Sequence, residues 1–150
     1  DYIKACKEAA HSIKVIGNGD ITDPLSAQKM FEHTGCDAIL VARGGMGHPW
    51  IVEDIIRHLK GKEPLERSLE DHRKALYEHF LLMQSYYAPR RVAIEMRRIG
   101  CWYLKKSSGT KSFREQMSRA ESLETVEKLI LNFVPEQLDS SPEETECETC

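Results

Sequence analysis

Residues 13–47 read IKVIGNGDITDPLSAQKMFEHTGCDAILVARGGMG, and the pattern within them decides the fold class. The β-branched run at 13–16 is followed by glycine-rich residues 17–20, which predicts a short buried strand that ends in a tight loop. The same order returns at 37–41, an apolar run that leads into a second glycine-rich turn at 43–47. A strand followed by a glycine turn is therefore predicted twice within this stretch.

Helical sequences separate and follow the two predicted strands. Asp23 precedes Pro24, and these residue types are preferred at a helix N-cap and at the first helical position. The helix is expected to run to about His33 and to end at Gly35. A second helix is expected at 49–59. Apolar strands that alternate with helices predict parallel pairing with both faces of the sheet covered.

Two strands alone leave the edges of a parallel sheet bare. We therefore interpret residues 1–60 as the end of a larger α/β domain, namely the last two strand–helix units of a TIM (β/α)8 barrel. We expect a preceding barrel portion or another chain to complete the sheet. Asp1, in place of methionine, stands within a helix-like stretch and agrees with the expectation of a longer protein.

Beyond a polar connector at 61–66 the pattern changes to helices only. Ser68 and Asp71 have the spacing of a capping box, in which two side chains cap each other's backbone N–H groups. Apolar side chains then recur at helical spacing, interrupted by Pro89 and by a turn at 107–110. The recurring positions are Leu76, Phe80 and Met83, then Val92, Met96, Ile99 and Tyr103, then Phe113, Met117 and Ala120, and finally Leu123, Val126, Leu129, Ile130 and Phe133.

Residues 64–134 are therefore predicted to form an all-α helical-bundle domain, followed by an acidic, disordered tail at 135–150. The chain has 21 Lys and Arg against 24 Asp and Glu, but the charges are unevenly placed. Between 90 and 119, two acids oppose a larger set of basic residues, which are Arg90, Arg91, Arg97, Arg98, Lys105, Lys106, Lys111, Arg114 and Arg119. This local excess favours a polyanionic partner such as RNA.

The composition is that of an ordinary globular protein, with 41% hydrophobic and 30% charged residues. No apolar run reaches the roughly 20 residues that span a bilayer, and no secretory signal pattern is visible. Five cysteines, an odd and scattered set, suit a reducing compartment, so we expect a cytoplasmic protein without membrane contact. Cys147 and Cys150 form a CxxC without a second pair, and no metal site is predicted. His48, His72 and His79 lack partners at metal or triad spacing and are interpreted as surface or capping residues.

The two glycine turns suit a phosphate group. Ligands of parallel α/β domains bind at the carboxyl ends of strands, where both turns are predicted to lie. In a TIM barrel the loops after the last two strands often hold phosphate through backbone N–H groups. Glycine lets the backbone approach an anion, and Arg43 can add a charged contact. The alternative, that these glycines only form turns, stays open on this pattern alone.

Several segments resemble the tRNA-dihydrouridine synthase family. In the α/β part they are VIGNGDI at 15–21, TGCDA at 34–38, ARG at 42–44 and GHPWI at 47–51, in the order and spacing of the family's last two barrel strands. In the helical part the resemblance continues at Arg97-Arg98, Trp102-Tyr103-Leu104 and Phe113-Arg114. The resemblance covers roughly residues 1 to 133.

The resemblance implies an FMN-dependent oxidoreductase that reduces uridine to 5,6-dihydrouridine in tRNA, with NADPH as the hydride source. Its FMN-contacting loops correspond here to Asn18, Gly19 and Asp20 and to Ala42, Arg43 and Gly44. The helical domain is implied to bind tRNA, and the candidate contacts are Arg97, Arg98, Lys105, Lys106 and Arg114.

Three features depart from the family's pattern. Ala42 stands where glycine is usual, and Ile99 stands where histidine is common. The family's catalytic cysteine lies on an earlier loop of the barrel, and no cysteine here stands in that context. We interpret Cys36 and Cys101 as packing residues. No catalytic residue is therefore assigned, and we expect this segment alone to be inactive.

Two other functions stay open. The first is a stand-alone helical RNA-binding module without catalysis, in which the α/β part is a structural remnant. The second is a TIM-barrel flavoenzyme that acts on a small molecule. The basic residues between 90 and 119 argue against the second alternative, whereas the incomplete barrel favours the first.

Overall fold

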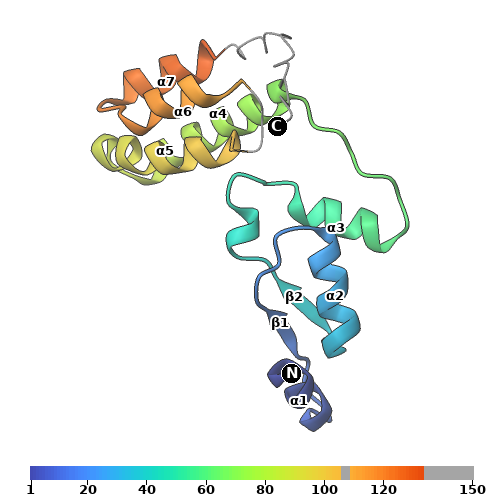
Figure 1. Ribbon diagram of the computed structural model, residues 1–150. Helices are drawn as coiled ribbons and strands as arrows, with labels where there is room; N and C mark the ends of the chain where they lie inside the picture. Colours follow the sequence, from blue (N-terminus) through green and yellow to red (C-terminus); the bar gives the residue numbers. More distant parts are fainter. Residues whose placement is uncertain (106–108, 134–150) are drawn as a thin grey trace, which may run out of the picture.

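The computed structural model describes residues 1–105 and 109–133. Figure 1 shows a small α/β part and a cluster of helices, which lies on the side where the strands end. The α/β part consists of α1 (Tyr2–Ala9), β1 (Ile16–Asn18), α2 (Pro24–Thr34), β2 (Ala38–Leu40), the 3-10 helix η1 (Arg43–Gly45) and α3 (Ile51–Leu59). The helical part consists of α4 (Leu69–Tyr86), α5 (Pro89–Tyr103), α6 (Lys111–Ser118) and α7 (Leu123–Leu131).

The two strands are parallel neighbours, as predicted. Ile16 is opposite Ala38, and Asn18 is opposite Leu40. The helix α2 forms the crossover between them and packs against both strands and α3. The predicted fold class, two parallel strand–helix units followed by an all-α region, is confirmed.

The predicted position of the first strand is wrong by about three residues. We expected 13–16 to form the strand and Gly17 to begin the turn, whereas β1 starts at Ile16 and contains Gly17. Gly17 is buried, and a Cβ there would lie 2.9 Å from Cys36 Sγ and 3.2 Å from Met30. Here glycine permits close packing of the strand against neighbouring side chains, and the turn begins only after Asn18.

The crossover helix α2 begins and ends as predicted. The Asp23 carboxylate accepts a hydrogen bond of 2.7 Å from the Ser26 N–H, and Ser26 Oγ accepts one of 3.1 Å from the Asp23 N–H. Pro24 occupies the first turn, where its missing N–H costs nothing. Gly35 ends the helix with a φ of 64°, a left-handed conformation that favours glycine.

The main hydrophobic core lies in the helical part. Its most deeply buried side chains are Leu76, Phe80, Val92, Met96, Leu104, Met117, Val126 and Ile130. The capping box predicted before α4 is present, because the Ser68 N–H donates to Asp71 Oδ2 at 2.8 Å and the Asp71 N–H donates to Ser68 Oγ at 3.1 Å. Apolar periodicity therefore predicted this bundle correctly. No helix in the described ranges has the length and apolar character to cross a membrane.

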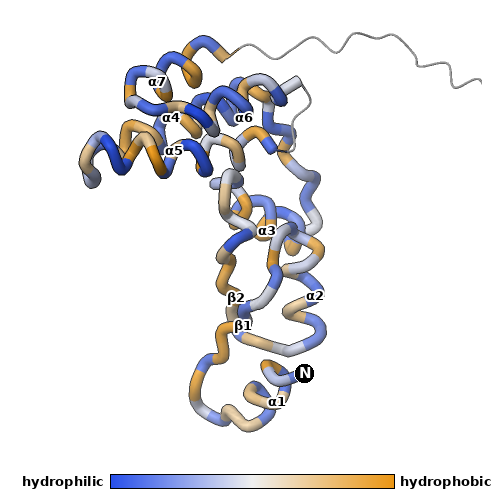
Figure 2. Tube along the Cα trace, turned by 60° about the vertical axis from the view of Figure 1, so that its left-hand side comes forward, coloured by the Kyte–Doolittle hydropathy of each residue, from blue (hydrophilic) through white to orange (hydrophobic). Residues whose placement is uncertain are grey.

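The core of the α/β part is much smaller. It contains Ile21, Ala27, Ile51 and Ile55, which lie between α2, α3 and the loop after β1. The strands themselves leave apolar side chains in solvent, since Ile16 is 63% exposed and Leu40 is 54% exposed. Figure 2 shows this hydrophobic colouring along β2. The prediction that both faces of the sheet are covered is therefore wrong for this chain.

Candidate functional site

The loops that follow β1 and β2 meet at one end of the sheet. Parallel pairing puts the carboxyl ends of both strands at the same edge, so the loops become neighbours. They enclose a hollow of about 580 Å³ lined by Asn18, Gly19, Asp20, Ile21, Thr22, Ala42, Arg43 and Gly44. All six residues predicted to contact a cofactor therefore line a single hollow.

The backbone of these loops takes conformations that few residue types allow. Gly19 has a φ of 143°, and Asp20 has a φ of 45° although it carries a side chain. Gly44 packs so closely on the first loop that a Cβ would collide with the Ile21 carbonyl oxygen and lie 2.8 Å from Thr22 Cα. Because only glycine fits there, the two loops are held in direct backbone contact.

One ion pair crosses the mouth of the hollow. A guanidinium nitrogen of Arg43 lies 2.6 Å from Asp20 Oδ1, and the two side chains are 80% and 85% exposed. Gly19 and Gly44 leave the backbone of both loops without side chains, beside the Arg43 guanidinium. A glycine-rich backbone beside a guanidinium suits an anion, so the hollow fits the phosphate end of a nucleotide-like cofactor.

A second hollow of about 730 Å³ lies where the α/β part meets the helices. Its wall shares Thr22, Arg43 and Gly44 with the first hollow and adds three further groups of residues. These are His48 and Asp54 around the start of α3, Arg67 and His72 around the start of α4, and Trp102, Tyr103 and Lys105 at the end of α5. Arg43, Arg67 and Lys105 make this wall mainly cationic, and Asp54 is the only carboxylate among its described residues. The two hollows thus adjoin, and the second favours anionic ligands.

His48, His72 and His79 are partly buried, whereas we predicted surface or capping residues. His48 Nε2 lies 2.9 Å from Asp54 Oδ2, and His79 Nδ1 lies 3.1 Å from the Tyr103 hydroxyl. Burial lowers the pKa of His79. Burial also lowers the pKa of His72, with a further contribution from the charge of His48. All three are therefore partly buried, and the sequence pattern did not reveal that His48 pairs with Asp54 or that His79 pairs with Tyr103.

The basic residues predicted to contact RNA fall into two environments. Arg97 is half-buried, and its Nε donates a hydrogen bond of 2.7 Å to the Ala120 carbonyl oxygen. Arg114 is also half-buried, with its Nε enclosed. Arg98 is exposed and stacks on Trp102, with 4.7 Å between the guanidinium carbon and the ring centroid.

Lys105 is exposed and borders the second hollow, whereas Lys106 lies outside the described residues. Trp102 is half-buried at the same border, so it is available to a ligand on one side. Arg98, Trp102 and Lys105 follow each other at helical spacing on α5 and its end. The structure therefore brings these three together and turns Arg97 and Arg114 inward.

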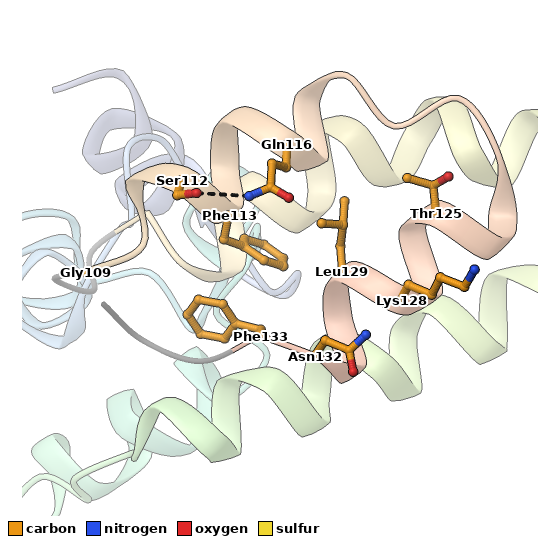
Figure 3. A pocket seen from close by; sticks show the side chains of 9 residues that line it. All are labelled: Gly109, Ser112, Phe113, Gln116, Thr125, Lys128, Leu129, Asn132 and Phe133. Carbon is orange, nitrogen blue, oxygen red and sulfur yellow. Dashed lines mark hydrogen bonds between the residues drawn. The ribbon is translucent and has the colours of Figure 1, made fainter. Parts of the chain in front are cut away.

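A third hollow of about 420 Å³ lies between α6 and α7 (Figure 3). Its floor contains Phe113 and Phe133, whose ring centroids are 4.8 Å apart in an edge-to-face contact. Ser112 and Gln116 are hydrogen-bonded across 2.9 Å at its rim, and Lys128 is its one charged residue. No sequence pattern indicated this hollow, and its described lining holds no carboxylate, histidine or cysteine.

The described cysteines lie apart from the first two hollows. Cys36 is buried under β1, which agrees with its predicted packing role. Cys101 is half-buried, and burial raises the pKa of its thiol. Within residues 1–105 and 109–133, no three His, Cys, Asp or Glu side chains gather as metal ligands do. Cys147 and Cys150 lie outside those ranges.

Comparison with known proteins shows what the chain is similar to. The model of the family described as dihydrouridine synthase (Dus) matches residues 1–139. The chain is 34% identical over 138 residues to the tRNA-dihydrouridine synthase B of Escherichia coli (strain K12), an alignment that covers 89% of this chain and 43% of the relative. It is 34% identical over 139 residues to tRNA-dihydrouridine synthase B of Pseudomonas aeruginosa, which covers 91% of this chain and 41% of the relative.

The protein of the same name from Pseudomonas putida is 37% identical over 123 residues, which are 81% of this chain and 36% of the relative. The chain thus spans about two fifths of the length of the curated relatives that it matches.

Proposed function

This chain belongs to the dihydrouridine synthase family, and on that premise we propose that it forms the C-terminal part of a tRNA-dihydrouridine synthase. In this proposal the α/β part holds the phosphate end of FMN, and the helical part holds tRNA. The activity of the whole enzyme is the reduction of uridine to 5,6-dihydrouridine in tRNA. A barrel portion or a second chain completes the sheet beside β1 and β2.

The observation that carries the proposal is the single hollow formed by the two loops. Asn18, Gly19 and Asp20 approach it from one strand, and Ala42, Arg43 and Gly44 approach it from the other. The Arg43 guanidinium supplies a donor for a phosphate, and Gly44 has no side chain to block the approach of the anion to the backbone of the loops. Ala42 replaces the family's usual glycine without closing the hollow.

In this proposal the residues of this chain bind and orient FMN and tRNA. They do not supply the proton that completes the reduction of uridine. The chemistry that bound FMN supplies is hydride transfer from NADPH to the C5–C6 double bond of uridine. A proton must also reach the uracil ring, and the resemblance assigns that step to a cysteine on an earlier barrel loop. None of the described cysteines lines either of the first two hollows, so this segment alone is proposed to be inactive.

The helical part is proposed to bind tRNA through the exposed edge of α5. Arg98 and Lys105 offer cations for phosphates, and Trp102 between them offers a ring face. The cationic second hollow continues this edge toward Arg43 and so links the RNA surface to the flavin loops. Arg97 contributes mainly by bonding the Ala120 carbonyl oxygen, which holds α5 against the end of α6.

The experiment is a reaction of the full-length protein with FMN, NADPH and tRNA that lacks dihydrouridine. Dihydrouridine is measured by mass spectrometry of the digested tRNA, and NADPH oxidation is followed in parallel. Dihydrouridine should form in amounts equal to the NADPH consumed on tRNA. Protein that carries flavin and oxidises NADPH without forming any dihydrouridine contradicts the proposal.

The runner-up is a helical RNA-binding module without catalysis, and one observation favours it. The helical part holds the larger core, whereas the strands leave Ile16 and Leu40 exposed. The two proposals differ in flavin content. Purified full-length protein that binds tRNA but takes up no FMN supports the module.

A further inference from the structure

The turn that carries Arg43 is held at both ends by backbone contacts. At its start Gly44 lies against Ile21 and Thr22 of the first loop. At its other end Gly47 has a φ of 72°, and a Cβ there would lie 2.6 Å from the Trp102 carbonyl oxygen and the Tyr103 nitrogen. The turn therefore spans the distance from the flavin loops to the end of α5, and neither contact leaves room for a side chain.

The residue after Gly47 is tied to α3. His48 Nε2 lies 2.9 Å from Asp54 Oδ2, and the Asp54 side chain is only 15% exposed. This bond joins two residues six positions apart and fixes the last part of the turn onto the helix that follows. Asp54 itself lines the second hollow but not the hollow that faces the flavin.

Asp54 also faces the connector between the two parts. A guanidinium nitrogen of Arg67 lies 4.0 Å from Asp54 Oδ1, and the guanidinium carbon lies 5.1 Å from the centroid of the Trp50 ring. The Trp50 ring in turn meets His72 of α4 edge-on, with 5.0 Å between centroids. Turn, α3, connector and α4 therefore converge on one small cluster.

We propose that Asp54 is a positioning residue for the flavin site: through His48 it sets the geometry of the turn that presents Arg43. The inference rests on the proposed function, because it concerns the same FMN loop. The inference is drawn from the contacts that succeed one another along the chain from Arg43 to Asp54. Arg43 sits on a turn with fixed backbone contacts at Gly44 and Gly47, and the His48–Asp54 bond holds the next residue, so loss of that bond loosens the turn from its helical end.

The test measures FMN affinity and backbone hydrogen exchange in the full-length protein. Asp54→Ala and His48→Ala should each weaken FMN binding by about two- to tenfold, the range for loss of one hydrogen bond. Both should speed hydrogen exchange in residues 43–48. The double variant should be no weaker than either single variant, because the two side chains act as one unit.

Two variants separate positioning from general damage. Asp54→Asn keeps an oxygen that can accept from His48 and should restore most of the FMN affinity. Glu53→Ala is the matched control, because Glu53 lies next to Asp54 and is an ion-pair partner of Arg67 at 2.6 Å. It does not bond His48, so FMN affinity and hydrogen exchange should match those of the unchanged protein.

The outcomes distinguish this inference from the proposed function. If Arg43→Ala weakens FMN binding while Asp54→Ala and His48→Ala leave it unchanged, the positioning role is wrong and the flavin loop stands. If Arg43→Ala also binds FMN normally, the loop assignment falls, and the inference falls with it. Should Asp54→Ala lose its fold by circular dichroism, His48→Ala breaks the same bond from its more exposed side and decides the question.

Discussion

Arg97 on α5 donates a hydrogen bond from its Nε to the carbonyl oxygen of Ala120, 2.7 Å away, just beyond the end of α6. The bond satisfies a backbone acceptor at a helix end, so this cation helps to hold the bundle together. Arg114 is also half-buried, but its enclosed Nε has no hydrogen-bond partner among the described residues. Replacing Arg97, Arg98 and Arg114 together would therefore mix the loss of RNA contacts with damage to the fold, and a sharper test uses exposed residues only.

The first prediction concerns RNA binding by α5. Arg98→Ala combined with Lys105→Ala should weaken tRNA binding and flatten the slope of log affinity against log salt. Each lost phosphate contact reduces that slope by roughly 0.7–0.9, so the pair should reduce it by about 1.4–1.8. Filter binding across a salt series measures the slope.

A control for this prediction removes the same charge elsewhere. Lys4→Ala combined with Lys29→Ala removes two exposed lysines from α1 and α2 and should leave the slope unchanged. Equal slopes for both double variants and the unchanged protein would show that the α5 edge is only a solvated face.

The second prediction concerns the flavin loop. Arg43→Ala should lower FMN retention, because the phosphate loses a charge-assisted hydrogen bond worth about 1.5–3 kcal/mol. That range corresponds to roughly 10- to 150-fold in dissociation constant. Arg43→Lys keeps the charge without the planar guanidinium, so its FMN affinity should lie between those of Arg43→Ala and the unchanged protein. Flavin absorbance of the purified full-length protein and FMN titration provide the measurement, and unchanged values for Arg43→Ala would remove the loop from the flavin site.

Local patterns predicted the helices well because the determinants of a helix lie within a few residues. Asp23 caps α2 through Ser26, three residues away, and Ser68 caps α4 through Asp71 in the same manner. Apolar spacing found the core of the bundle for a similar reason, since Leu76 and Phe80 must share a helix face. Parallel pairing of the strands followed from the glycine turns and the crossover helix between them.

Local sequence patterns could not predict contacts between segments that are distant in the chain. Gly17 belongs to β1 and packs against Cys36, a contact between distant residues that the pattern of a glycine turn does not predict. His79 pairs with Tyr103, 24 residues away, and Arg97 pairs with Ala120, 23 residues away. The two loops predicted to contact the cofactor lie side by side, because parallel pairing of the strands places their ends together. The contacts of Asp54 with His48 and Arg67 became visible only in the three-dimensional structure.

The third prediction concerns acid stability at the base of the sheet. Asp37 accepts hydrogen bonds from Lys7 at 2.6 Å, from the Val15 N–H at 2.9 Å and from Lys14 at 3.2 Å. These donors, Lys7 first, hold the pKa of Asp37 well below its usual range. A carboxyl group with a lowered folded-state pKa stabilises the fold above its unfolded pKa of about 4, and this stabilisation is lost as the pH falls below that value.

The melting temperature should therefore fall between pH 6 and pH 3, and Asp37→Asn should reduce that fall. The control Glu8→Gln removes an exposed carboxylate of α1 outside this cluster and should retain the full pH dependence. If Asp37→Asn and the unchanged protein lose stability equally over this pH range, the Asp37 cluster does not govern the acid response.

The last prediction concerns the open sheet. Ile16 and Leu40 are 63% and 54% exposed on two strands that, within the described residues, pair only with each other. Unpaired strand edges and exposed apolar side chains promote association. The 150-residue chain on its own should therefore self-associate in sedimentation velocity at micromolar concentrations. Ile16→Thr combined with Leu40→Thr should reduce this association, because threonine is β-branched and so suits a strand, and it exposes less apolar surface. Leu82→Thr, a change at a similarly exposed position on α4, should not reduce it. A monomer at every concentration, or dissociation caused by Leu82→Thr alone, would show that the chain does not associate through the exposed strands.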